Sequence, residues 1–86
     1  MKEFTHIIAN EIGLHARPAG NLVKLAKSFS SKVTIEKAGK PPVNGTALMK
    51  VMGLCAMKGD EVKITIEGED EEKAFESIKK YMDENL

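Results

Sequence analysis

One stretch decides the fold: residues 61–67 read Glu-Val-Lys-Ile-Thr-Ile-Glu. Apolar and polar side chains alternate along it, which is the period of a strand with one buried face. A sheet with one buried face needs a second layer to cover it. The stretch therefore predicts a sheet that meets helices on one side and solvent on the other.

Two segments supply the helical spacing that such a layer needs. From about Ala16 to Phe29, the apolar positions on one helical face are Ala19, Leu22, Val23, Ala26 and Phe29. After Gly68, an acidic run leads into apolar residues at helical spacing, namely Ala74, Phe75, Ile78 and Met82. Acidic residues at the start and lysines toward the end suit the helix dipole.

The remaining segments complete an alternating order of elements. Residues 2–9 and 32–36 suit strands, and residues 40–44 suit a short strand at an edge, because Pro41 and Pro42 cannot donate to a ladder. Residues 47–54 form a short apolar segment that we expect to be helical. The order strand, helix, strand, strand, helix, strand, helix predicts an α+β fold with an antiparallel sheet and helices on one face.

Length and composition limit the possible functions. The 86 residues suffice for one compact domain, which we expect to span residues 1–86 as a monomer. Thirteen basic and thirteen acidic residues give no net charge and no basic face, which argues against a nucleic-acid partner. The sequence contains no apolar run long enough to suggest membrane insertion. The single cysteine, Cys55, is expected to be buried and reduced. We therefore expect a cytoplasmic protein.

The segment that carries chemistry is residues 13–19, which read Gly-Leu-His-Ala-Arg-Pro-Ala. His15 falls just before the predicted first helix, where the first backbone N–H groups, those of Ala16 and Arg17, form an anion site. Pro18 suits the first turn because its fixed φ matches a helix and its missing N–H is not needed there. The Arg17 guanidinium can reach phosphoryl oxygens.

The spacing alone leaves other interpretations open. His15 can be a helix cap and Arg17 a solvated charge. A small hydrolase with His15 as base lacks a nucleophile with an orienting carboxylate. An interaction or nucleic-acid-binding module lacks a basic face with interleaved aromatic residues. His6 has no second ligand at metal-binding spacing, so no metal site is expected.

The run from Gly13 to Ala19 resembles the signature of the HPr family, the histidine-containing phosphocarriers of the bacterial phosphoenolpyruvate-dependent sugar phosphotransferase system. The resemblance extends to Val43-Asn44, residues 48–54, Lys58-Gly59 and Asp70-Glu71. It implies an open-faced β-sandwich of a four-stranded antiparallel sheet and three helices.

The same resemblance implies a phosphoryl carrier rather than an enzyme. His15 would accept a phosphoryl group on Nδ1 from enzyme I and pass it to enzyme IIA domains of sugar permeases, with Arg17 assisting and no cofactor or metal. The family also implies a docking patch at Leu48, Met49 and Met52. A specialised paralogue serving another phosphorelay is the nearest alternative.

One position departs from the family pattern. Gram-positive members carry a regulatory serine at the start of the second helix, and the alignment places Ala47 there. Ala47 has no hydroxyl group to phosphorylate. The neighbouring Thr46 is expected to cap the helix through its side-chain oxygen.

Overall fold

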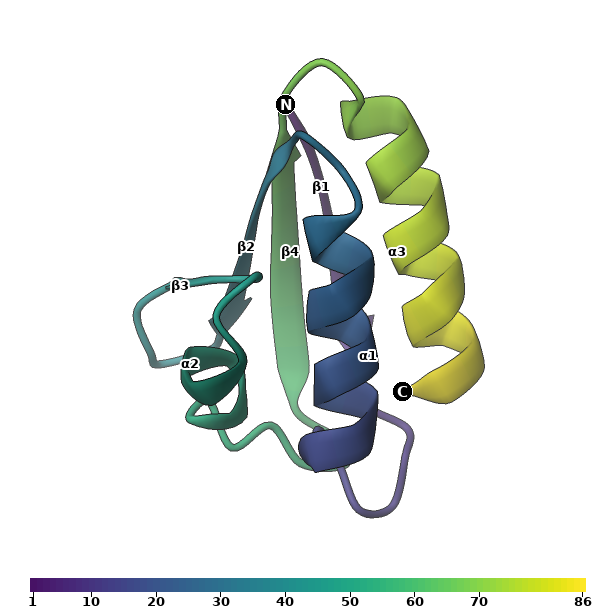
Figure 1. Cartoon of the computed structure of the whole chain (residues 1–86). Coiled ribbons are helices and arrows are strands. Elements are labelled where there is room, and N and C mark those ends of the chain that lie inside the picture. Colours follow the sequence, from purple (N-terminus) through teal and green to yellow (C-terminus); the bar gives the residue numbers. More distant parts are fainter.

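The computed structural model describes residues 1–86 and shows a four-stranded antiparallel sheet with three helices (Figure 1). In chain order the elements are β1 (Lys2–Ile7), α1 (Ala16–Lys27), β2 (Lys32–Lys37), β3 (Val43–Asn44), α2 (Leu48–Met52), β4 (Glu61–Glu67) and α3 (Glu71–Asn85). This is the order that the sequence predicts. Even α3, the longest helix at 15 residues, is too short and too polar to cross a lipid bilayer, as are the others.

Strand β4 lies inside the sheet, whose strand order is β1-β4-β2-β3. Its alternation is confirmed, because Val62, Ile64 and Ile66 are all buried. Ile64 lies opposite Phe4 of β1 on one side and Ile35 of β2 on the other. The most regular strand in the sequence therefore pairs with two neighbours, and its buried side chains form the floor of the core.

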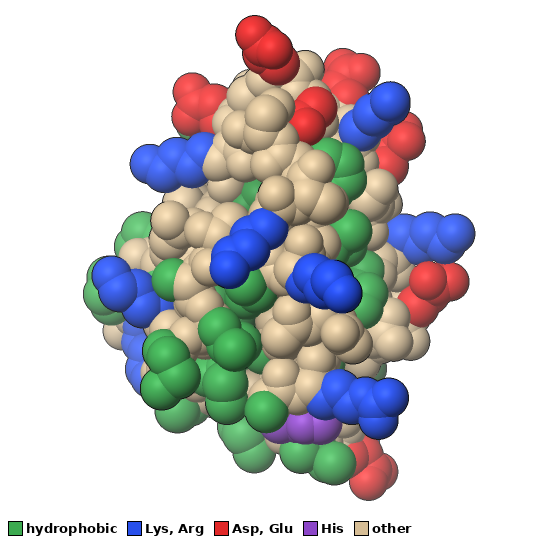
Figure 2. All heavy atoms as spheres, in the orientation of Figure 1, with side chains coloured by type: hydrophobic (Ala, Val, Ile, Leu, Met, Phe, Trp, Pro, Cys, Tyr) green, Lys and Arg blue, Asp and Glu red, His purple; other side chains and the backbone are tan.

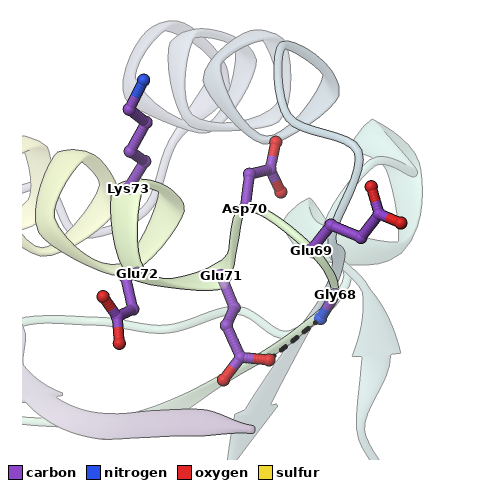
Figure 3. Close-up of a pocket in the computed structure, with 6 residues that line it drawn as sticks. All are labelled: Gly68, Glu69, Asp70, Glu71, Glu72 and Lys73. Carbon is purple, nitrogen blue, oxygen red and sulfur yellow. Dashed lines mark hydrogen bonds between the residues drawn. The ribbon is translucent and has the colours of Figure 1, made fainter.

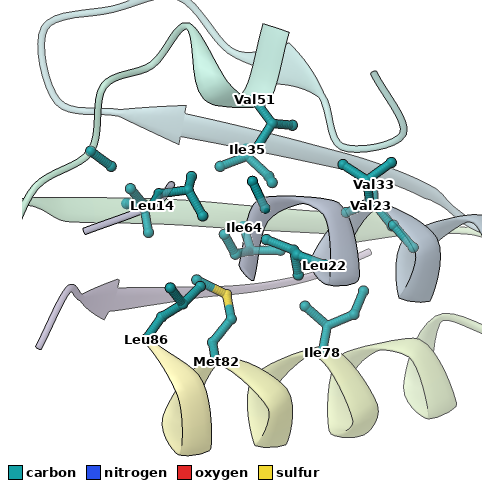
Figure 4. Packing of buried hydrophobic residues seen from close by; sticks show 14 of the residues in the cluster. Leu14, Leu22, Val23, Val33, Ile35, Val51, Ile64, Ile78, Met82 and Leu86 are labelled. Atoms are coloured by element: carbon teal, nitrogen blue, oxygen red, sulfur yellow. The ribbon is translucent and has the colours of Figure 1, made fainter. Parts of the chain in front are cut away.

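The core lies between the sheet and the helices α1 and α3, which run side by side over one face (Figures 1 and 4). Helix α1 buries Ala19, Leu22, Val23 and Ala26 of its predicted apolar face, whereas Phe29 follows the end of the helix and is half-buried. Helix α3 buries Ala74, Ile78 and Met82. Phe75 of α3 meets Phe4 of β1 edge to face, with ring centroids 5.4 Å apart. The opposite face of the sheet is polar, as an open-faced sandwich requires.

Three details differ from the sequence prediction. Strand β3 has only two residues, because Pro41 and Pro42, which precede it, have no N–H group to donate to β2. Strand β1 ends at Ile7 rather than at residue 9. The expected burial of Cys55 is wrong: this residue follows α2 in the left-handed region, with φ of 52°, and its side chain is exposed.

His6 belongs to the contact between β1 and α3. Its side chain is largely buried, and its Nδ1 atom lies 3.4 Å from a carboxylate oxygen of Asp83 in the last turns of α3. Its Nε2 atom is buried without a hydrogen-bond partner. The fold thus supplies one acidic neighbour that no short-range spacing in the sequence indicates.

Asp70 connects the start of α3 to the turn that enters β2. Its carboxylate accepts hydrogen bonds from the backbone N–H groups of Ser30 at 2.8 Å and Ser31 at 2.9 Å, and also from the Ser31 hydroxyl. These donors, the Ser31 hydroxyl first, hold the pKa of Asp70 below its usual value. The acidic residues at the start of α3 therefore include one with a structural partner 40 residues away in the chain.

We expect Asp70→Asn to lower the thermal unfolding midpoint at about pH 7, because an amide nitrogen cannot accept these hydrogen bonds. Since folding depresses the pKa of Asp70, the carboxylate stabilises the fold above about pH 4, and this contribution is lost as the pH falls further. Circular dichroism melts should therefore show a difference from wild type that shrinks toward about pH 3. Glu69→Gln, an exposed neighbour, is the control, and an equal difference at both pH values would contradict the assignment.

Candidate functional site

His15 lies where the loop after β1 enters α1, at the lower end of the helix in Figure 1. It is the N-cap residue, with an extended backbone of φ −98° and ψ −175°, and its carbonyl accepts the N–H of Ala19 at 2.9 Å. Its side chain makes no capping hydrogen bond. The predicted place of His15 is confirmed, and the imidazole is left free for another task.

The helix start beneath His15 offers unused hydrogen-bond donors. The backbone N–H groups of Ala16 and Arg17 donate to no acceptor within the protein, and Pro18 has none to offer. No acidic residue lies in the first turn of α1 to compete for them. Two free N–H groups at the positive end of a 12-residue helix suit a bound anion.

Arg17 adds a positive charge at the same place. Its side chain is exposed, and none of the ion pairs of the protein includes it. Its guanidinium group is therefore available to a ligand at His15, where a planar fork of donors matches phosphoryl oxygens well. His15 is half-buried, so the ring is held by its surroundings and still reachable from solvent.

Gly13 allows the loop to lie against a second segment of the chain. Its φ is +84°, and a Cβ atom at this position would lie 2.5 Å from the carbonyl oxygen of Ala56. The next residue, Leu14, is buried and donates its N–H to the same oxygen at 2.8 Å. This close approach fixes the entry of the chain into α1 and so the position of His15.

A groove of about 190 Å³ opens beside His15, Arg17 and Pro18. Its other lining residues are Asn10, Asn21, Tyr81 and Asn85, so it contains amide groups and a guanidinium but no carboxylate side chain. The sequence analysis missed these four residues. No local signal indicates Tyr81 and Asn85, since they lie more than 60 positions from His15 in the chain.

Hydrophobic side chains gather over α2, on the side of the molecule next to the start of α1 (Figure 2). Met49 is 80% exposed and Leu48 38% exposed. Met52, in contrast, is half-buried and packs against the core. Of the three residues of the expected docking patch, Leu48 and Met49 are therefore exposed, whereas Met52 is half-buried because the inner face of this short helix points into the core.

The start of α2 also differs from expectation. Ala47 is the N-cap residue, so the predicted cap by Thr46 is wrong. The Thr46 hydroxyl donates to the side-chain oxygen of Asn44 at 2.7 Å, and the Thr46 N–H donates to the same oxygen at 2.9 Å. Asn44 thus organises this turn in place of a helix cap.

The largest surface hollow lies elsewhere, at the start of α3, and measures about 570 Å³ (Figure 3). It is lined by residues 68–73, with four carboxylate side chains and no hydrophobic residue. The Glu71 carboxylate accepts the N–H of Gly68 there, at 3.2 Å. Such a hollow repels anions, so the anion site at His15 remains the candidate functional site.

Comparisons with known proteins identify the family of this chain. A family model described as the PTS HPr component phosphorylation site matches residues 2–84. The phosphocarrier protein HPr of Mycoplasma capricolum is 41% identical over 85 residues, which cover 95% of this chain and 91% of that protein. A solved histidine-containing phosphocarrier protein from Mycoplasma has a TM-score of 0.91 at 38% identity, covering 96% of this chain and 93% of the other.

Some relatives are much longer proteins. The multiphosphoryl transfer protein of Salmonella typhimurium is 44% identical over 75 residues, which cover 84% of this chain but 20% of that protein. This chain therefore spans about a fifth of the length of that relative. With the match over residues 2–84 and the shared fold, the chain belongs to the HPr family, the HPr component of the phosphotransferase system.

Proposed function

We propose that the protein is a phosphoryl carrier that accepts a phosphoryl group on His15 Nδ1 from enzyme I and transfers it to enzyme IIA domains of sugar permeases. One observation supports this most directly: the His15 side chain leaves the helix start uncapped, beside two unused N–H groups. An ordinary cap would use its side chain to satisfy such a donor.

The transfer conserves the phosphoryl group. The P–N bond to the donor histidine of enzyme I breaks as the bond to His15 Nδ1 forms, and the reverse exchange delivers the group to the acceptor histidine of enzyme IIA. The N–H groups of Ala16 and Arg17 and the Arg17 guanidinium stabilise the phosphoryl oxygens through charge-assisted hydrogen bonds. The carrier returns to its starting state after each transfer.

The surroundings of His15 suit a carrier better than a hydrolase. The site is a shallow surface feature, and no carboxylate side chain lines the groove beside it. A general base that activated water would shorten the life of the phosphohistidine, and apart from His15 itself no histidine or carboxylate side chain lines this groove. The carrier is proposed to act in the cytoplasm, where a free thiol such as Cys55 stays reduced, and its monomeric state stays a prediction.

We propose that the exposed face of α2, Leu48 and Met49, is the docking patch for both partners. These side chains are exposed on α2, which contacts α1, the helix that begins after His15. Met also adapts well to differently shaped partners. Met52 supports the patch from below, since it packs against the core.

Incubation with phosphoenolpyruvate and a competent enzyme I should add one acid-labile phosphoryl group to the wild-type protein. His15→Ala should add none, because the accepting nitrogen is gone, while its circular dichroism melt should stay close to that of wild type. Intact mass spectrometry before and after acid treatment provides the measurement. A labelled His15→Ala variant, or an unlabelled wild type, would refute the proposed function.

Met49→Lys should raise the KM of enzyme I for this protein by about tenfold, because docking would then have to bury a charge where it now buries an exposed apolar side chain. The kcat should change little, since Met49 does not touch His15. Ile7→Lys is the matched control: Ile7 is 60% exposed at the end of β1, where no docking patch is proposed. Equal KM values for Met49→Lys and wild type would exclude Met49 from the interface.

We further propose that Ala47 removes this chain from regulation by serine phosphorylation. Incubation with an HPr kinase and ATP should leave the wild type unlabelled, whereas Ala47→Ser should become labelled, because the substitution restores a hydroxyl at the N-cap of α2. Intact mass and peptide mapping distinguish the two proteins. Stoichiometric label on Thr46 of the wild type would show that the neighbouring hydroxyl replaces the serine.

A further inference from the structure

The last turn of α3 contacts the chain on both sides of His15. In Figure 1 this turn ends beside the start of α1 and the loop that follows β1. On the helix side, the Tyr81 hydroxyl donates a hydrogen bond to the carbonyl oxygen of Pro18 at 3.1 Å. The Tyr81 ring is half-buried and packs against the core, so this hydroxyl is held in place.

On the loop side, Asn10 makes the corresponding contacts. Its backbone N–H donates to the main-chain oxygen of Leu86 at 3.1 Å, and its side-chain amide donates to that of Asn85 at 3.4 Å. The Leu86 side chain is buried, which anchors the end of α3 against the loop. The C-terminal end of α3 therefore holds both the first turn of α1 and the loop after β1, which meet at His15.

Asn10 extends this support toward His15 itself. Its side-chain oxygen accepts the N–H of Ile12 at 3.0 Å, and its carbonyl accepts the N–H of Gly13 at 3.0 Å. The Gly13 carbonyl in turn accepts the N–H of His15, also at 3.0 Å. Short hydrogen-bonded steps thus connect the end of α3 to the backbone of His15.

We propose that Tyr81, near the end of α3, is a positioning residue for phosphoryl transfer at His15. The role in phosphoryl transfer rests on the proposed carrier function, whereas the effect of Tyr81 on the first turn of α1 can be measured without it. Tyr81 makes no hydrogen bond to the imidazole of His15. It fixes the first turn of α1, whose free N–H groups must face the phosphoryl group on His15.

Positioning matters here because in-line transfer depends on alignment. A misplacement of about 1 Å can cost on the order of a hundredfold in rate. Tyr81 lines the groove beside His15, so it lies near the transferred group without supplying charge to it. Its contribution should therefore appear in kcat rather than in the affinity for partners, which the face of α2 is proposed to provide.

The first test needs no partner protein. Tyr81→Phe removes only the hydroxyl and keeps the packed ring, and Asp70→Asn is a control that weakens α3 at its other end. Hydrogen exchange followed by NMR should show the Ala19 N–H, which closes the first turn onto His15, exchanging about fivefold faster in Tyr81→Phe, the effect expected for one lost hydrogen bond. The rate should rise less in Asp70→Asn.

The second test measures transfer. With phospho-enzyme I as donor, Tyr81→Phe should lower kcat about fivefold with KM unchanged, whereas Asp70→Asn should leave both near wild type at a temperature where all three proteins are folded. Asn10→Ala, which cuts the loop side, should lower kcat in the same way. Agreement of the two variants would support positioning from both flanks of His15.

The outcomes separate the two proposals. Unchanged Ala19 exchange in Tyr81→Phe would overturn the positioning role, whether or not the protein is phosphorylated. Equal losses in Tyr81→Phe and Asp70→Asn would also overturn it, because general destabilisation would then explain the effect. A wild type that accepts no phosphoryl group would refute the carrier function, and the exchange experiment would still decide the role of Tyr81.

Discussion

The hydrogen bond from the Leu14 N–H to the Ala56 carbonyl, 2.8 Å long, fixes the place where α1 begins. It can form only because Gly13 has no Cβ atom, which would otherwise collide with the same carbonyl. From this contact follow the extended backbone of His15, the first turn of α1 and the exposure of its N–H groups. The site therefore exists only where the segment between β1 and α1 lies against the chain that follows α2.

The site holds the His15 backbone firmly but offers a bound phosphoryl group only exposed hydrogen-bond donors. Backbone hydrogen bonds hold His15 on both flanks, while the groups that would meet a phosphoryl group remain unpaired at the surface. Solvent can satisfy such exposed donors at little cost, so the empty site does not strain the fold. A shallow, solvated anion site stabilises its ligand only modestly, and this agrees with a group that must be released to the next protein.

Helix α3 is connected to the rest of the structure at both ends. At its start Asp70 binds the turn before β2, and at its end Tyr81, Asn85 and Leu86 meet α1 and the loop after β1. Its middle packs on the sheet through Ala74 and Ile78. The helix farthest from His15 in sequence is thus the one that completes the groove beside this residue. Helix α2, which carries the proposed docking patch, contributes no residue to the groove.

Local sequence patterns were enough to predict the order of elements, the buried face of β4 and the place of His15 at the start of α1. These are local properties, since the period of apolar residues and the preferences of Gly and Pro act over a few positions. Four features became apparent only in the folded structure: the half-buried position of Met52, the exposure of Cys55, the role of Asn44 in place of a Thr46 cap, and the groove with Tyr81 and Asn85. Each of these depends on contacts between segments distant in the chain, or on which way a short segment faces, and no local spacing specifies which segments will meet.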